Sequence, residues 1–425
     1  MHIDQLSDAE LAQRLASAES DYAALAASGL SLDLTRGKPG AQQVALSDAL
    51  DGILQGDYRA ADGTDVRNYG GLFGLPEARE LFGAWLDAPA AETLVGGNAS
   101  LSLMYTVIDC ALNEGLRGPG SAWGQAERVR FLCPAPGYDR HFSICQYLGI
   151  EMLTVPMLAE GPDMDAVEAL LRDDPSIRGI WCVPRFSNPT GCVYSDATVE
   201  RIAGLANLAD GDFVVMWDNA YAVHTLYPDA PRLASVRAAC ARAGTADSLF
   251  QFGSTSKVTF AGAGVAFMAS TTGNLDTLSR HLSYQTIGPD KVNQLRHVRF
   301  LRDAENIAAH MEAHATLIRP RFEAVLRALE EGLGGTGMGR WETPRGGYFI
   351  AFDTLPGLAR EVVRLAAEVG VSLTPAGATF PYGEDPRDSN IRLAPTFPSQ
   401  QDVEAAARAF VTCVQLATLR QKAAA

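Results

Sequence analysis

The sequence lacks three features that would assign it to other protein classes. It has no basic segment: 35 Lys and Arg stand against 50 Asp and Glu, for a formal net charge of −15. This disfavours nucleic acid and anionic membrane surfaces as partners, because both require a cationic face. No uncharged apolar run approaches the length of a membrane span, and the start MHIDQLSDAE has no apolar core, so we expect no secretory signal. None of the seven cysteines belongs to a Cys-x-x-Cys pair, which favours reduced thiols in a cytoplasmic protein over disulfides or a zinc ribbon.

What remains is the composition of a globular protein. Hydrophobic residues make up 47% of the chain, charged residues 20% and aromatic residues 8%, all near the averages for folded domains. At roughly 100–200 residues per domain, 425 residues predict two or three domains.

Short apolar runs alternate with helical patterns through the middle of the chain. The runs have no period-two alternation, which is typical of strands buried on both faces of a parallel sheet; they lie at 129–133, 152–157, 179–183, 213–217, 249–252 and 265–269. After about residue 290 a long charged helical stretch continues to 333, with Pro320 expected to mark a break or the start of a new helix. The pattern predicts an α/β protein with an N-terminal arm at 1–49, a large domain at 50–292 and a smaller α+β domain at 293–425.

Two histidines, His310 and His314, lie four residues apart in that helical stretch. The spacing is compatible with metal binding, but the surrounding residues are mostly polar and no third ligand is indicated. We therefore expect a solvated helix face and no metal site.

Four polar elements follow predicted strands or start a predicted helix. They are Asn188-Pro-Thr-Gly191, Asp218-x-x-Tyr221, Ser254-Thr-Ser-Lys257 and Gly96-Gly97-Asn98. Open α/β sheets bind ligands at the carboxyl ends of their strands, so these elements are expected to meet.

Together they supply what pyridoxal phosphate (PLP) requires. Lys257 offers the amine for a Schiff base, and Asp218, after an apolar run, offers a buried carboxylate that the protonated ring nitrogen would pair with. Tyr221 and Asn188 would hydrogen-bond the phenolic oxygen. The phosphate would lie at the helix start after Gly97, with further contacts from Asn98, Ser100, Ser254 and Ser256.

With these residues the sequence resembles the fold-type I PLP enzymes, and among them the aspartate aminotransferase-like group. The resemblance covers nearly the whole chain and extends to Arg36-Gly-Lys-Pro39, Asn68-Tyr69 with Gly74-Leu-Pro-Glu-Ala-Arg79, Pro136-Gly-Tyr138 and Asn390-Ile-Arg392. It implies a mainly parallel seven-stranded sheet covered by helices, with a smaller α+β domain.

The resemblance also implies roles for single residues. Tyr138 would stack on the cofactor ring, and Arg392 would hold the substrate α-carboxylate with a bidentate fork. Gly37, Lys38 and Asn188 would contribute to the substrate site. Tyr69 would reach the phosphate of the neighbouring subunit, which implies a homodimer with active sites at its interface.

One position departs from the family. Its members commonly carry an arginine shortly after the lysine, in a Gly-x-Arg pattern that binds the phosphate, whereas here Gly264 or Val265 occupies that place. The missing charge-assisted contact would contribute roughly 1.5–3 kcal/mol. Arg36 and Lys38 remain candidates for replacing it.

The expected activity is PLP-dependent amino-group transfer from aspartate to 2-oxoglutarate. Lys257 would act as the general base at the substrate α-carbon. A dicarboxylate needs a second cation, for which Arg140 is the first candidate and Arg185 the second. Transamination of aromatic or kynurenine-type amino acids and β-elimination remain open, as does a PLP-sensing regulatory domain, although no basic DNA-binding segment is visible.

Overall fold

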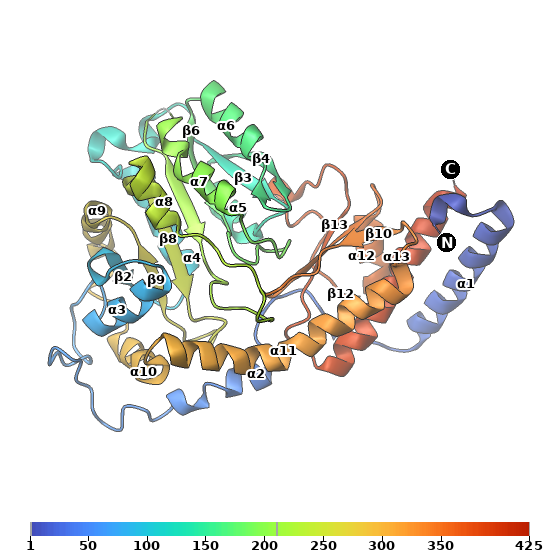
Figure 1. Cartoon of the computed structure of the whole chain (residues 1–425), viewed down its shortest axis with the longest axis horizontal. Helices are drawn as coiled ribbons and strands as arrows, with labels where there is room; N and C mark the ends of the chain where they lie inside the picture. Colours follow the sequence, from blue (N-terminus) through green and yellow to red (C-terminus); the bar gives the residue numbers. More distant parts are fainter. Residues whose placement is uncertain (1, 210, 425) are drawn as a thin grey trace.

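The computed structural model describes residues 2–209 and 211–424, and its largest element is an eight-stranded sheet. The strand order is β2-β9-β8-β7-β6-β3-β4-β5 (Figure 1). Strands β3, β4, β6, β7 and β8 run parallel, and β2, β5 and β9 pair antiparallel with their neighbours. The strands are β2 (Thr93–Val95), β3 (Arg130–Ala135), β4 (Glu151–Leu158), β5 (Gly161–Pro162), β6 (Ile177–Cys182), β7 (Val214–Asp218), β8 (Leu249–Ser254) and β9 (Ala266–Ala269).

All six predicted apolar runs are strands of this sheet, so the expectation of a mainly parallel sheet is confirmed. The sheet has eight strands where seven were expected, because the two-residue β5 adds an antiparallel edge to β4. Successive residues of β7 enter different cores: Met216 packs on one face of the sheet and Trp217 on the other. Burial on both faces explains the lack of alternation in the sequence.

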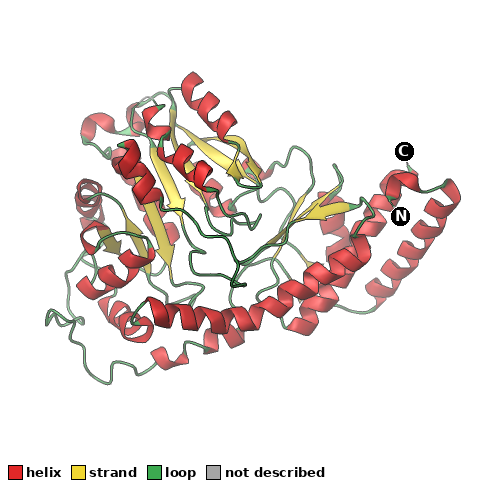
Figure 2. Cartoon of the chain, viewed as in Figure 1, coloured by secondary structure: helices red, strands yellow, loops and turns green. Residues whose placement is uncertain are grey.

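Helices cover both faces of the main sheet (Figure 2). The core that includes Met216 receives side chains from α4 (Ser100–Asn113), α5 (Asp139–Tyr147) and α9 (Thr272–Ser283). The core that includes Trp217 receives them from α6 (Met164–Asp173), α7 (Asp196–Ala203) and α8 (Val236–Ala243). Helix α3 (Pro76–Trp85) packs beside β2 and β9.

A second, smaller group of elements surrounds an antiparallel sheet of β10 (Gly339–Trp341), β11 (Ile350–Thr354) and β13 (Asn390–Leu393). Strand β1 (Leu32–Asp33) pairs separately with β12 (Val371–Ser372). Helix α1 lies along α13, so the two ends of the chain are close together (Figure 1). The helices of this part are α1 (Asp8–Ala27), α2 (Ala41–Ala45), α11 (Ala304–Leu333), α12 (Ala359–Glu368) and α13 (Gln400–Ala423), whereas α10 (Lys291–Leu301) packs against α3 of the larger part. The domain boundaries at 49 and 292 stay a prediction.

The predicted helix break at Pro320 is wrong, because α11 runs through it. A proline inside a helix lacks one main-chain donor and crowds the preceding turn. Here the flanking residues Ile318 and Phe322 are buried in the core of the smaller part. Their apolar burial offsets the local cost and keeps the helix continuous.

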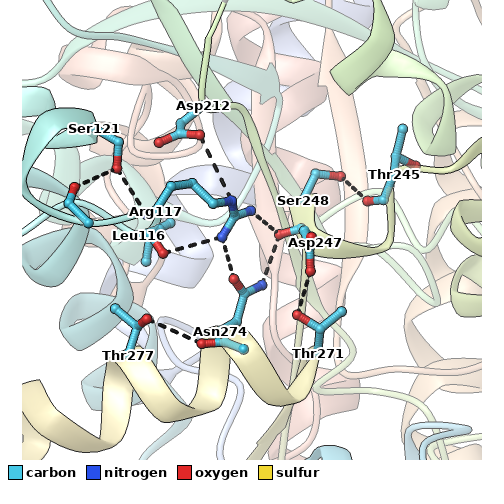
Figure 3. A network of polar contacts seen from close by, with 12 residues as sticks. Leu116, Arg117, Ser121, Asp212, Thr245, Asp247, Ser248, Thr271, Asn274 and Thr277 are labelled. Carbon is cyan, nitrogen blue, oxygen red and sulfur yellow. Dashed lines mark hydrogen bonds and ion pairs between the residues drawn. The ribbon is translucent and has the colours of Figure 1, made fainter.

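A polar network ties the helices to the amino-terminal edge of the main sheet, opposite the edge where ligands are expected (Figure 3). Arg117 donates from Nη2 to the carbonyl of Asp247 at 2.6 Å and from Nη1 to Asn274 of α9. Asn274 donates to the same carbonyl at 2.8 Å. These contacts join the loop after α4 to the start of β8.

Two predictions about protein class can be compared with the structure. Within the described residues, no helix combines the length and apolar character that crossing a bilayer requires. All seven cysteines are free thiols, as expected from their spacing.

Candidate active site

The carboxyl ends of three adjacent strands bring the predicted residues together. Asp218 is the last residue of β7 and Ser254 the last of β8, while Asn188 lies in the loop that follows β6. All three are buried. Because β6, β7 and β8 are parallel neighbours, their ends lie at one edge of the sheet, as predicted.

Lys257 lies in the turn directly after β8. Its Nζ is 5.0 Å from the centre of the Tyr221 ring, so the amine faces the segment that follows Asp218. Burial lowers the pKa of Lys257, the charge of Asp218 opposes this shift, and the charge of Arg392 adds to it. The site therefore raises the fraction of neutral, nucleophilic amine.

Asp218 has one carboxylate oxygen bound and one free. Its Oδ2 lies 3.0 Å from Nε2 of His141, and both side chains are almost completely buried. Its Oδ1 is buried without a hydrogen-bond partner in the described part of the chain. A buried carboxylate oxygen in this state is poised for a proton donor from a bound ligand.

His141 was not among the residues proposed from the sequence. Its ring stacks on Trp181, with centroids 4.3 Å apart and an interplanar angle of 10°, which aims Nε2 at Asp218. The only sequence signal was its position three residues after Tyr138, on the same face of the start of α5.

Arg392 reaches the site from β13 of the smaller sheet. Its Nη1 donates to Asn188 Oδ1 at 3.1 Å and to Asp139 Oδ1 at 2.9 Å. The guanidinium lies over the ring of Phe349, 4.9 Å from its centre, and Nε has no partner among the described residues. The contacts hold the guanidinium in place with one donor free for a carboxylate.

The predicted phosphate contacts come from two segments. Helix α4 starts at Ser100, and the residue before it, Ala99, supplies no side-chain cap, so the amide groups of its first turn are not satisfied by a cap. Ser254 Oγ donates to Ser256 Oγ at 3.2 Å, and Ser256 Oγ donates to the carbonyl of Asn98 at 3.3 Å. A helix N-terminus and two hydroxyl groups thus lie together, which suits an anion.

The position expected for the phosphate arginine is closely packed. A Cβ added to Gly264 would lie 3.0 Å from Oγ1 of Thr255 and 3.2 Å from the amide nitrogen of Ser256. The next residue, Val265, donates its amide to Thr255 Oγ1 at 2.9 Å. Thr255 and Ser256 would have to shift by a few tenths of an ångström to admit a side chain at 264, so the tight packing favours glycine at this position.

Tyrosines form the walls around Asp218. The pKa of Tyr138 is raised by burial and by the charge of Asp218, and the pKa of Tyr221 is raised by burial and by Tyr138 and Asp218. Both phenols therefore stay protonated and able to donate hydrogen bonds. Gly37 packs on Phe349, since a Cβ there would lie 2.4 Å from that ring.

Four proposed residues lie outside this cluster. The side chain of Tyr69 is 83% exposed to solvent. The Nζ of Lys38 lies 3.8 Å from the centre of the Phe397 ring. Arg140 is exposed and borders a surface hollow of about 570 Å³ with Tyr105 and Tyr147. Arg185 donates to the carbonyl of Ala222 and to Thr225 Oγ1, and it lines a different cavity. The side chain of Arg185 is thus unavailable to a substrate at Lys257.

Comparisons with known proteins find similar chains over nearly the whole length of this one. The family model for aspartate amino-transferases matches residues 6–425. An aspartate aminotransferase of Corynebacterium glutamicum is 44% identical over 92% of this chain and 91% of its own. The crystal structure of an aspartate transaminase from the same organism superposes with a TM-score of 0.96, at 41% identity and 99% coverage of both chains. An α-aminoadipate aminotransferase of Thermus thermophilus has a TM-score of 0.75 over 98% of this chain and 100% of its own, and at 23% identity it shows the shared fold alone.

Proposed function

Because the chain belongs to the aspartate amino-transferase family and is a PLP-dependent aminotransferase, we propose that it binds PLP at Lys257 and transfers the amino group of aspartate to 2-oxoglutarate. The observation that carries the proposal is the unpartnered Oδ1 of buried Asp218, close to a lysine of lowered pKa. A relative that is 44% identical is an aspartate aminotransferase, which supports aspartate as the amino donor.

The donors and acceptors of the site fit PLP. Asp218 would hold the proton of the ring nitrogen through its free Oδ1, and His141 would keep that carboxylate oriented. Tyr221 and Asn188 would bind the phenolic oxygen and Tyr138 would cover the ring. When bound, PLP supplies an electron sink for the negative charge that develops at the substrate α-carbon. The phosphate would bind Gly97, Asn98, Ser100, Ser254 and Ser256, with Arg36 and Lys38 as candidates for the missing cation.

Lys257 is the proposed base. Its Nζ, once free of the cofactor, would take the proton from the α-carbon of the amino acid and later return it. Burial favours the neutral amine that this step needs, because it lowers the pKa of Lys257. The nearby Asp218 limits the shift, so the amine remains basic enough to accept the proton.

Two arginines are proposed for the substrate carboxylates. Arg392 would bind the α-carboxylate, because Nε is free while Asn188 and Asp139 hold Nη1. Arg140 would bind the distal carboxylate. Arg140 lies two residues beyond Tyr138. Burial raises the pKa of Tyr138, and the positive charge of Arg140 partly opposes this shift, so the guanidinium is close enough to influence a side chain of the site.

We also propose a homodimer with Tyr69 at the active site of the neighbouring subunit. Tyr69 is 83% exposed, as are Tyr147 at 78% and Tyr284 at 86%, which leaves large aromatic side chains free for an interface. Buried Lys291 donates to the carbonyls of Asn68, at 2.8 Å, and Gly70, so the loop that carries Tyr69 is held in place.

We expect the enzyme to work in the cytoplasm. Seven thiols are free, and six of these cysteines are buried. A reducing compartment keeps such thiols from forming disulfides.

A panel of amino donors with 2-oxoglutarate tests the function. We expect aspartate to give a kcat/KM at least about tenfold above alanine, phenylalanine and kynurenine, a ratio that one added charge contact supplies. Lys257→Ala is the control that should give no turnover with any donor. A higher kcat/KM with phenylalanine or kynurenine, or release of β-elimination products, would refute the aspartate assignment.

A further inference from the structure

A second cavity lies directly behind the candidate active site. Its volume is about 860 Å³, within the range of small-molecule sites. Side chains alternate in direction along a strand. Asp218 therefore faces the active site, whereas Trp217 and Asn219 line the cavity, followed by Ala222, Val223 and Thr225. We call it the rear cavity.

Arg185 lines the rear cavity and pairs with no acidic side chain in the described part of the chain. It donates to the carbonyl of Ala222 and, at 3.3 Å, to Thr225 Oγ1, which are both neutral oxygens. Its Nε is buried and makes no hydrogen bond within the described ranges. Burial and the charge of Arg232 lower the pKa of Arg185, so its charge is poorly compensated. A carboxylate in the cavity would supply the missing counter-charge and accept from Nε.

Two buried acceptors on the same cavity lack donors. Glu77 Oε1 accepts from the amide of Ala61 at 3.0 Å, but its Oε2 has no partner among the residues described. Asn219 Oδ1 is also buried without a donor. Glu80 adds a second carboxylate to the lining. An ammonium group, with three N–H donors and a positive charge, satisfies these acceptors.

The rest of the lining is mainly apolar, although Asp87, Arg302, Asp303 and Glu312 also border the cavity. Leu81 and Trp85 come from α3, and Ile307 and Met311 from α11. They offer a surface for a hydrocarbon side chain, whose transfer from water would favour binding.

From these three features we propose that the rear cavity binds a free α-amino acid with an apolar side chain. Arg185 receives its carboxylate, Glu77 and Asn219 receive its ammonium group, and the apolar lining receives its side chain. The site is separate from the proposed catalytic one and does not depend on the aspartate assignment. Since the segment 217–225 forms one wall of each site, an amino acid in the rear cavity would contact the backbone that carries Asp218 and Tyr221.

The probe is 1-aminocyclopentane-1-carboxylate, an apolar amino acid without an α-hydrogen, so transamination cannot consume it. Titration calorimetry on the holoenzyme should give saturable binding. Arg185→Met and Glu77→Gln should each weaken binding about tenfold or more, whereas Arg345→Met, a surface arginine paired with Asp229, should not. Cyclopentanecarboxylate and cyclopentylamine, which each lack one charged group, should bind at least about tenfold more weakly.

Arg392→Met separates the two sites. Binding in the rear cavity survives this substitution, whereas binding through the proposed α-carboxylate contact is lost. Loss of binding in Arg392→Met with retention in Arg185→Met would overturn the proposal, as would the absence of saturable binding to the wild-type enzyme. A melting temperature of Arg185→Met near that of Arg345→Met verifies that the variant is folded.

Discussion

Acidification from pH 6 to pH 5 should destabilise the folded chain by about 3 kcal/mol, because three histidines are buried in their neutral form. Burial lowers the pKa of His224 to about 3, with further contributions from the charge of Lys257 and from His314. Burial likewise lowers the pKa of His297 and that of His314 to about 4.

The sign follows from which state binds more protons. In the unfolded chain a histidine titrates near about 6.5, so between pH 6 and pH 5 the unfolded state takes up protons that the folded state does not. The contribution of these neutral histidines to the free energy of unfolding is therefore complete above about pH 6.5. It is lost as the pH falls toward their pKa values in the folded state. Each histidine contributes roughly 1 kcal/mol over this interval. Carboxylates with lowered pKa values act mainly below pH 5, since their ordinary values are about 4.

His224→Phe isolates one third of the effect. The His224 ring lies edge-on to the rings of Tyr221 and Tyr348, with centroids 5.6 and 5.5 Å away, and phenylalanine keeps such packing without a titrating group. Urea unfolding at fixed protein concentration should show a loss of unfolding free energy between pH 6 and pH 5 that is about 1 kcal/mol smaller in the variant. Between pH 7 and pH 8, the control interval, the two proteins should change in parallel. Equal losses in both proteins between pH 6 and pH 5 would refute the reasoning.

Three further predictions concern the catalytic residues. Lys257→Ala should abolish turnover and covalent cofactor attachment; a borohydride-stable adduct in this variant, detected by mass spectrometry, would contradict its role. Asp218→Ala removes the counter-charge for the ring nitrogen and the hydrogen-bond partner of His141, at a cost of about 3–5 kcal/mol, so kcat/KM should fall more than about a hundredfold; a loss under about tenfold would be incompatible with the proposed pairing. Arg140→Ala should reduce kcat/KM for aspartate about tenfold or more and leave alanine and phenylalanine nearly unchanged; equal losses for all donors would place the distal carboxylate elsewhere.

Residues at strand ends could be found without the structure because their local sequence carries the signal. Asp218 and Ser254 follow apolar runs, and adjacent parallel strands must end at the same edge. Gly97 and Ser100 mark a helix start in the same way. The position of Lys257 followed from these neighbours, and the structure places its amine 5.0 Å from the centre of the Tyr221 ring.

Residues whose environment depends on distant partners were missed or misjudged. His141 meets Asp218, 77 positions away. His314 was expected on a solvated face, which is wrong: it is buried and contacts Gln43, which in turn donates to Tyr348 at 3.0 Å. The local pattern around His314 is polar because the neighbouring face of α11 is exposed.

The order of apolar runs and the polar residues that end them were enough to predict the class of fold and the sheet edge at which Asp218, Ser254 and Lys257 lie, because main-chain geometry turns each run into a strand with a defined end. The role proposed for Arg392 came from the family resemblance instead. Only the packed structure decided that one oxygen of Asp218 has no partner among the described residues, that Gly264 packs tightly against Thr255 and Ser256, and that Arg185 faces the rear cavity. These outcomes depend on which side chains from distant segments fill the same space. Because side chains from distant segments pack closely together, the environments of these three residues cannot be predicted from the local sequence around them.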